Sequence, residues 1–285
     1  FFLGMAIEKW NLHKRIALSI IKLTGTNGNN IILGFILSTG FLSMWLSNTA
    51  TTMMMYPIAA SVIVVISKHA DPAANIKNFS LTLMMALAYA SNFGGIATII
   101  GTPPNVAYVR HLNEHYKHGI DFVNWMMLCM PLAIILLFML YLVMVKWLYP
   151  NRLTQSIDGK LFIETELKEM GPLSRQEKRV LLVFCSTAFL WITKDIINST
   201  QKFFQLDDTI IALLGAISLF IIPSGRTEEN TEERLLEWSD TKKMAWGILL
   251  LFRRKLNETC PIKHYFSSST LPFFQYFRSS FGLFL

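Results

Sequence analysis

The chain has 285 residues, of which 52% are hydrophobic and 16% are charged. Soluble domains carry roughly 25% charged residues, so this composition indicates a membrane protein and argues against a soluble enzyme or binding domain. The formal net charge of +7 is divided among short segments between apolar runs, which leaves no long basic face for a nucleic-acid backbone and is typical of cytoplasmic loops.

The first 23 residues combine an apolar stretch with a basic, amphipathic segment. Residues 1–7 are apolar, and we expect them to be the end of a transmembrane helix that begins before this sequence. Residues 8–15 are charged. They lead into residues 16–23, which are mostly apolar and include Lys22. This pattern predicts a helix lying in the membrane interface, with a plain basic loop as the alternative.

Residues 31–66 form two apolar runs separated by the polar sequence SNTATT at 47–52. Each run is shorter than the ~20 residues that a full span requires. Hydrocarbon offers polar groups no hydrogen-bond partner, so the polar residues must face water, protein or a ligand. The pattern predicts a re-entrant helical hairpin with Ser47 and Asn48 at its tip; a simple helix cap between two packed segments is the alternative.

The chemistry of such a tip follows from the ends of its two half-helices. The first half-helix ends in free carbonyl groups and the second begins with free N–H groups. Carbonyl and hydroxyl oxygens suit a small hard cation such as Na⁺, whereas the N–H end, with its positive partial charge, suits a carboxylate.

A second apolar segment, residues 79–109, is interrupted by SNFGGIATIIGTPPN at 91–105. Gly94, Gly95 and Gly101 permit backbone angles that other residues avoid. Pro103 and Pro104 cannot continue a helix but can start one. The pattern predicts an unwound transmembrane helix that restarts near Pro104, and interrupted helices that meet at mid-membrane build ion and substrate sites in transporters. An ordinary kinked helix is the alternative.

Together, SNTATT and GGIATIIGTPPN resemble the divalent anion/sodium symporters, a family of dicarboxylate and citrate carriers. The resemblance runs from residue 1 to about residue 252. It implies an all-α, multi-pass, inverted-repeat transporter fold with a re-entrant hairpin and a broken helix. Family members carry a second copy of both motifs, and no second Ser-Asn-Thr follows residue 252, so we expect a truncated chain that lacks most of the second repeat.

The resemblance also implies a shared site for substrate and ion, and a homodimer for the full-length form. The residues implied to bind substrate are Ser47, Asn48, Thr49, Thr102 and Pro103. The residues implied to bind Na⁺ are Ser43, Ser47, Asn48, Gly101 and Thr102. Pro104 and Asn105 are expected to shape the turn, and no metal other than sodium is implied.

The rest of the chain supplies further expected spans and loops. Residues 79–149 are expected to hold the broken helix and a following transmembrane helix, with Trp125 and Trp147 at its two interfaces. A hydrophilic cytoplasmic loop is expected at 150–179. Two spans and the start of a third are expected at 180–252. A charged, solvated loop at 226–243 is expected between the second span and the third. Lys194 and Asp195, near the end of one span, are a candidate gate or proton relay, with a neighbouring pair at the interface as the alternative. Residues 253–285 match no expected segment and suggest a frameshift.

Charge in the loops supports the re-entrant prediction independently. When loops are placed alternately, nearly all basic residues fall on one side, which is then cytoplasmic. The other side holds only Arg110, Lys117, Lys194 and Lys202. A spanning segment at 31–66 would invert every later loop and destroy this asymmetry.

One competing motif is H-x-x-E-H at His111, Glu114 and His115, a spacing seen in zinc hydrolases. Three fixed positions arise easily by chance, and no further acidic ligand stands on a recognisable helix, so interfacial polar residues are the better interpretation.

We therefore predict a sodium-coupled carrier of di- or tricarboxylates, with succinate-like C4 acids as substrate, in the cell (inner) membrane. Two alternatives stay open: an inactive membrane remnant, and a carrier for sulfate or another oxyanion. No general acid–base pair, nucleophilic triad or phosphate-binding loop indicates an enzyme.

Overall fold

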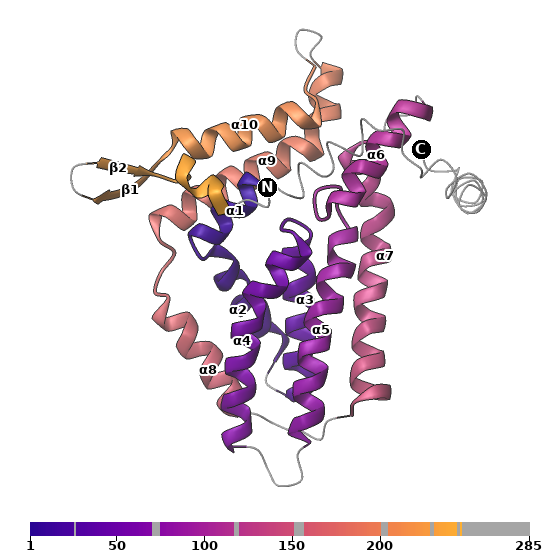
Figure 1. Cartoon of the computed structure of the whole chain (residues 1–285), viewed down its shortest axis with the longest axis vertical. Helices are drawn as coiled ribbons and strands as arrows, with labels where there is room; N and C mark the ends of the chain where they lie inside the picture. The colour runs from indigo at the N-terminus through magenta and orange to yellow at the C-terminus, as the bar shows by residue number, and fades with distance from the viewer. Residues whose placement is uncertain are drawn as a thin grey trace. The chain divides into compact units, whose positions relative to one another are not determined.

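The computed structural model describes residues 1–25, 27–69, 75–116, 120–150, 157–200, 205–228, 231–243 and 246. Helices make up most of this part of the chain (Figure 1). Three helical stretches are long and apolar enough to cross a membrane, namely Asn48–Lys68, Ile76–Ile96 and Phe122–Leu148, and two shorter apolar helices cover Gly28–Ser43 and Asp208–Ile221. The expected aberrant tail at 253–285 lies outside the described residues.

Residues 1–242 form one compact unit. Its helices, in chain order, are α1 (Phe2–Lys9), α2 (Leu12–Thr24), α3 (Gly28–Ser43), α4 (Asn48–His69), α5 (Ile76–Ile96), α6 (Pro103–Tyr116), α7 (Phe122–Leu142), the π-helical turn η1 (Val143–Leu148), α8 (Ile157–Glu169), α9 (Arg175–Thr200) and α10 (Asp208–Ile221). The strands β1 (Pro223–Glu228) and β2 (Thr231–Arg234) follow, and the 3-10 helix η2 (Trp238–Lys243) comes after them.

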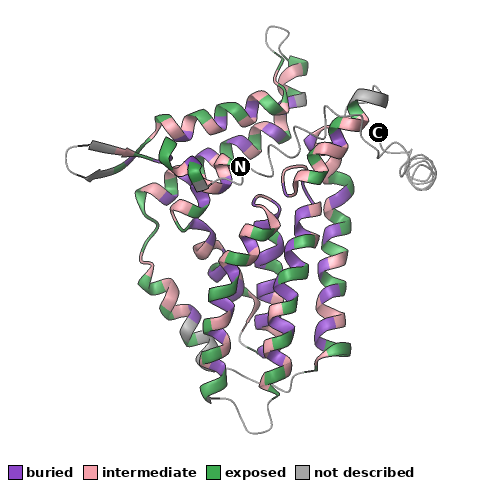
Figure 2. Ribbon diagram, viewed as in Figure 1, coloured by how far each residue is buried: buried purple, intermediate pink, exposed green. Residues whose placement is uncertain are grey.

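The largest hydrophobic cluster joins α2, α3, α4, α5, α7, η1 and α8. Helix α3 lies at its centre, and Ile31, Ile32, Phe35 and Ile36 on that helix have no exposed surface. Figure 2 shows the buried residues concentrated where these helices face one another. A helix that is apolar on most sides needs protein or lipid on most sides, which explains why α3 is enclosed.

A second hydrophobic cluster joins α1, α9, α10 and the residues that follow β2. Ala6 and Ile7 of α1 pack there with Val180 and Val183 of α9. Leu235 and Leu236 are fully buried in the same cluster, and their N–H groups donate to Ile222 O at 3.0 Å and Leu219 O at 3.0 Å.

The segment expected to be only a charged loop, 226–243, contains part of a β hairpin, and the expectation of a purely α-helical fold is wrong in this detail. Strands β1 and β2 pair antiparallel, with Pro223 opposite Arg234 and Glu228 opposite Thr231. The burial of Leu235 and Leu236 explains the difference, because it anchors one end of a segment whose charged composition predicts a solvated loop.

Helix α2 begins at Leu12, four residues before the apolar run that predicted it, and it is amphipathic. Ala17, Leu18 and Ile21 are fully buried on one face. On the other face, Lys14 forms an ion pair with Glu166 of α8 at 2.7 Å, and Lys22 lies 3.9 Å from Glu164. The hydrophilic loop expected at 150–179 therefore contains a helix, α8, whose Ile163 is buried in the largest hydrophobic cluster and whose Glu166 pairs with Lys14.

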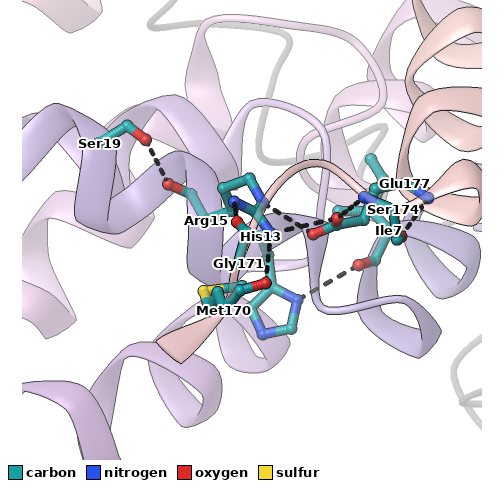
Figure 3. Close-up of polar contacts among 8 residues, drawn as sticks. All are labelled: Ile7, His13, Arg15, Ser19, Met170, Gly171, Ser174 and Glu177. Atoms are coloured by element: carbon teal, nitrogen blue, oxygen red, sulfur yellow. Dashed lines mark hydrogen bonds and ion pairs between the residues drawn. The ribbon is translucent and has the colours of Figure 1, made fainter. Parts of the chain in front are cut away.

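Arg15 of α2 binds the turn between α8 and α9 (Figure 3). Its guanidinium donates to Glu177 Oε1 at 2.9 Å, Gly171 O at 2.8 Å and Met170 O at 3.1 Å. Glu177 also accepts from the N–H of Ser174 at 2.7 Å, and Ser174 Oγ accepts from the N–H of Glu177 at 3.1 Å. This reciprocal capping box, together with Arg15, fixes the start of α9 relative to α2.

The Glu177 network predicts a specific dependence of stability on pH. Burial alone would raise the pKa of Glu177, but hydrogen bonds from Arg15 and Ser174 hold it below its ordinary value. Because the folded pKa is lower than the unfolded one, the stabilisation is complete above the unfolded value of ~4.3 and is lost as the pH falls through the folded value. We expect Glu177→Gln to lower the free energy of unfolding at neutral pH by about 1–3 kcal/mol.

This difference between Glu177→Gln and the wild type should shrink as the pH falls below ~4.3 and through the lower folded pKa of Glu177, where the wild-type carboxylate is also neutralised. Unfolding of the detergent-solubilised chain at several pH values measures it. Glu164→Gln serves as the control, since its 3.9 Å contact with the exposed Lys22 should contribute little. A difference in the free energy of unfolding that does not change with pH would show that the Glu177 carboxylate is not its cause.

Candidate functional site

Helices α3 and α4 are separated by a turn at residues 44–47, and α5 and α6 are separated by a loop at 97–102. The two breaks lie side by side. Ser43 Oγ lies 2.6 Å from Ser91 O of α5, and Thr98 Oγ1 in the loop donates to Met44 O in the turn. Thr98 Oγ1 also accepts from the N–H of Gly101 at 3.0 Å. Sequence positions about 50 residues apart thus meet at one place, as the two motifs predict.

Glycines bring oxygen atoms of the two breaks close together. A Cβ atom at Gly95 would lie 2.2 Å from Asn48 Oδ1. A Cβ atom at Gly101 would lie 2.6 Å from Gly95 O and 3.0 Å from Ser43 O. A larger residue at Gly95 would collide with the Asn48 side chain, and one at Gly101 would collide with the backbone carbonyls of Gly95 and Ser43.

A similar close approach joins the helices themselves. A Cβ atom at Gly94 would lie 2.2 Å from Gly40 O and 2.6 Å from Gly40 Cα. The backbones of α3 and α5 therefore touch one turn before the breaks, and this contact determines how far apart the two breaks can be.

The hydroxyl of Ser43 adds a further oxygen to the site. It lies 2.6 Å from Ser91 O and 2.8 Å from Asn48 Oδ1. A hydroxyl has one proton, so it can donate to only one of these acceptors at a time. When that proton is on the Ser91 side, the Ser43 and Asn48 oxygens face each other as two acceptors, an arrangement that favours a cation beside them.

Side chains donate hydrogen bonds to the carbonyl groups at the break between α5 and α6. Asn105 Nδ2 donates to Gly95 O at 3.0 Å and to Thr98 O at 2.9 Å. From α7, Trp125 Nε1 donates to Ile96 O at 3.0 Å. These contacts satisfy groups that an interrupted helix leaves without intrahelical partners.

Helix α4 and helix α6 differ in what their first turns offer an anion. Ser47 caps α4, since its Oγ accepts from the N–H of Ala50 at 3.3 Å. The N–H groups of Asn48 and Thr49 belong to the first turn and have no carbonyl within the helix to bind. Helix α6 starts with Pro103 and Pro104, which have no N–H. Any backbone donors for an anion therefore come chiefly from α4.

The structure brings some of the predicted site residues together and leaves others outside that group. Ser43, Asn48 and Gly101 lie together around the oxygen cluster. Ser47 serves as a helix cap, as the simpler interpretation of the tip expects, and Thr49 is exposed beside it. Thr102 and Pro103 are half-buried at the start of α6.

Sequence reasoning missed the residues that fasten α4 to α5. Thr52 Oγ1 lies 2.8 Å from Ser91 Oγ and 2.9 Å from Asn48 O. Asn48 Nδ2 donates to Asn92 Oδ1 at 3.1 Å. All three missed residues, Thr52, Ser91 and Asn92, stand inside the two quoted motifs, but only the packing of α4 on α5 shows that they pair.

Lys194 of α9 pairs with acidic residues at the starts of α7 and α10. Its side chain is 4% exposed and forms ion pairs with Asp121 at 3.0 Å and Asp208 at 2.9 Å. Beside it, Phe122 stacks on Trp191 with ring centroids 4.8 Å apart, and Trp45 of the α3–α4 turn lies 6.3 Å from Phe122. This contact connects the turn to α9 and α10.

The H-x-x-E-H motif at His111, Glu114 and His115 falls partly outside the described side chains. All three residues lie on α6, but the side chains of Glu114 and His115 are outside the described part of the structure. Among the residues that the structure describes, no group of three His, Cys, Asp or Glu side chains is placed to hold a metal ion.

Comparisons with known proteins agree with the resemblance carried by the two motifs. Residues 1–257 match the family model described as "Sodium:sulfate symporter transmembrane region". Sodium-dependent dicarboxylate transporters SdcS from Staphylococcus saprophyticus and Staphylococcus aureus are each 36% identical over 256 residues, which is 88% of this chain and 49% of the relative. The chain thus spans about half the length of the curated relatives it matches.

Proposed function

The chain belongs to the divalent anion/sodium symporter family, and from this premise we propose that it carries one half of a sodium-coupled site for di- or tricarboxylates. Membership makes it an integral, multi-pass membrane protein of a family of transporters and not of enzymes. Location in the cell membrane and a homodimer in the full-length form are part of the proposal.

The sodium site is proposed at the oxygens around Gly95 and Gly101. The observation that carries it is that Asn48 Oδ1 lies against Gly95, while Gly95 O and Ser43 O lie against Gly101. Hard cations prefer such oxygen ligands. Ser47, Thr102 and the Ser43 hydroxyl complete the proposed set.

The anion site is proposed beside it, at the first turn of α4. One substrate carboxylate would accept from the backbone N–H groups and side chains of Ser47, Asn48 and Thr49, where the helix end carries positive partial charge. Thr102 and Pro103 would border the same space from α6. Na⁺ bound at Asn48 would lower the cost of bringing the anion there.

A C4 dicarboxylate such as succinate is the proposed substrate, because the relatives at 36% identity are named dicarboxylate transporters. The family model is named for sulfate, which supports sulfate as the second candidate. In this proposal the α3–α4 segment is a re-entrant hairpin, and the hairpin and the α5–α6 break move together during transport.

Binding of radioactive sodium and succinate to the purified chain tests the proposal. We expect succinate binding to require Na⁺, and Asn48→Ala to weaken Na⁺ binding by at least ~10-fold, since it removes one of few oxygen ligands. Ser199→Ala on α9 is a matched control that also removes one polar group and should bind normally.

Three results would decide between the candidates. Displacement of succinate by excess sulfate, with tighter binding of sulfate, would favour the oxyanion carrier. Absence of any Na⁺-dependent binding would favour an inactive membrane remnant. Unchanged binding in Asn48→Ala would place the site elsewhere.

A further inference from the structure

We propose that Asn92 is a positioning residue that keeps the carbonyl oxygen of Asn48, and not its amide nitrogen, turned toward the sodium site. This inference rests on the function proposed above and names a residue that neither motif identified as part of the site. Asn92 lies on α5, one turn before the break, and does not itself reach the oxygen cluster through any contact that the structure gives it.

The argument starts at an atom whose role is fixed. Asn92 Nδ2 lies 2.9 Å from Ala88 O, a backbone carbonyl that can only accept. The nitrogen of the Asn92 amide must therefore occupy this end, and its oxygen must occupy the other. That oxygen, Oδ1, lies 3.1 Å from the Asn48 side chain.

The same logic then fixes Asn48. An acceptor at Asn92 Oδ1 requires a donor opposite, so the nitrogen of the Asn48 amide faces Asn92. The oxygen of Asn48 consequently faces Ser43 Oγ, 2.8 Å away, and the space beside Gly95. The carbonyl of Ala88 thus fixes the orientation of the Asn92 amide, and Asn92 in turn fixes the orientation of the Asn48 amide at the proposed ion site.

The other neighbour of Asn48 cannot perform this selection. Ser43 has a hydroxyl, which can donate to an amide oxygen or, when its proton is on Ser91 O, accept from an amide nitrogen. A flipped Asn48 would therefore still find a partner at Ser43. With Asn92 present, the same flip would place two oxygens against each other 3.1 Å apart, with no proton between them.

The orientation matters because the two ends of an amide have opposite effects on a cation. The oxygen is a ligand, whereas the NH₂ group carries positive partial charge and cannot coordinate. The position of Asn92 also needs an explanation of its own, since it is an exposed polar side chain on α5, a helix long and apolar enough to span a membrane. A polar group in such a helix is costly to keep in a membrane, so its presence there suggests a functional role.

Binding of radioactive sodium to the purified chain tests the inference with two substitutions. Asn92→Ala removes the acceptor and should weaken Na⁺ binding by ~10-fold, the lower end of the range for groups that orient ligands. Asn92→Asp loses the hydrogen bond to Ala88 O but keeps an acceptor for Asn48, so it should bind Na⁺ no more weakly than the wild type. Asn92→Leu, which also has no acceptor, replaces the alanine variant if that variant does not fold.

A second background separates positioning from packing. In Asn48→Asp both side-chain oxygens can coordinate, so there is no orientation to select, and adding Asn92→Ala should not lower the sodium affinity of that background. An equal loss in both backgrounds would show that Asn92 acts only by holding α4 against α5, and would overturn the inference. Asn198→Ala is the control, because Asn198 also makes two hydrogen bonds, to Leu206 at 2.9 and 2.8 Å, away from the site.

The wild-type measurement distinguishes this inference from the proposed function. If the wild-type chain binds no sodium, the proposed function fails and the role of Asn92 fails with it. If the wild type binds sodium and Asn92→Ala binds it equally well, only the positioning role is refuted.

Discussion

Gly94→Ala is expected to abolish sodium binding and to lower the free energy of unfolding by at least ~3 kcal/mol, the upper end of typical overpacking costs. The added Cβ would lie 2.2 Å from Gly40 O and 2.6 Å from Gly40 Cα, and both atoms belong to backbone that cannot rotate away. Helices α3 and α5 would have to separate, and the two breaks that they carry would separate with them. Sodium titration and thermal unfolding of the purified chain measure the two effects.

Gly171→Ala provides the matched control for this change. A Cβ at Gly171 meets no heavy atom within 4 Å, but the residue has a φ of +64°, which disfavours alanine. We expect a loss of stability of ~1 kcal/mol and unchanged sodium affinity. Normal sodium binding by Gly94→Ala would show that the α3–α5 contact does not determine the site.

Lys194→Met should destabilise the chain by about 3 kcal/mol, the lower end of the range for breaking a buried ion pair. The substitution leaves Asp121 and Asp208 facing each other without the cation that lay 3.0 and 2.9 Å from them. The lower end applies because Asp121 and Asp208 keep 40% and 30% of their side-chain surface exposed. Chemical unfolding in detergent measures the change.

Two further variants show whether charge is the cause. Adding Asp208→Asn to Lys194→Met should restore part of the lost stability, because it removes one of the two uncompensated charges. Lys22→Met is the control, since Lys22 is exposed and 3.9 Å from Glu164, and its loss should change stability by less than ~1 kcal/mol. Equal losses of stability in Lys194→Met and Lys22→Met would contradict the interpretation that Lys194 stabilises the chain through its buried ion pairs.

The positions of the two chain breaks could be predicted from sequence, because the residues that interrupt a helix act locally. Pro103 cannot continue α5 and starts α6, and the polar residues at 47–52 begin α4. The proposed site residues Ser43, Asn48 and Gly101 follow from those breaks and from the family resemblance. The predictions of sodium coupling, a membrane location and this family also agree with the comparisons.

The residues that hold the breaks together could not be predicted, because they depend on which helices touch. Asn92 is one polar residue among several in its motif until α4 packs against α5. Trp125 was interpreted as an interfacial aromatic residue, yet its indole N–H binds Ile96 O in the break. The β hairpin was missed for a similar reason, since its charged sequence gives no sign that Leu235 and Leu236 are buried beside it.

The oxygens that surround Gly95 and Gly101 come from amides, hydroxyls and peptide groups, and this has an electrical consequence. If Na⁺ binds there, the empty site is neutral and the occupied site carries the full charge of its cargo. A membrane potential acts on a moving charge with ~2.3 kcal/mol per elementary charge per 100 mV. The voltage should therefore drive only the loaded step, in proportion to the number of sodium ions in excess of the charge of the anion, and current recordings would count those ions directly.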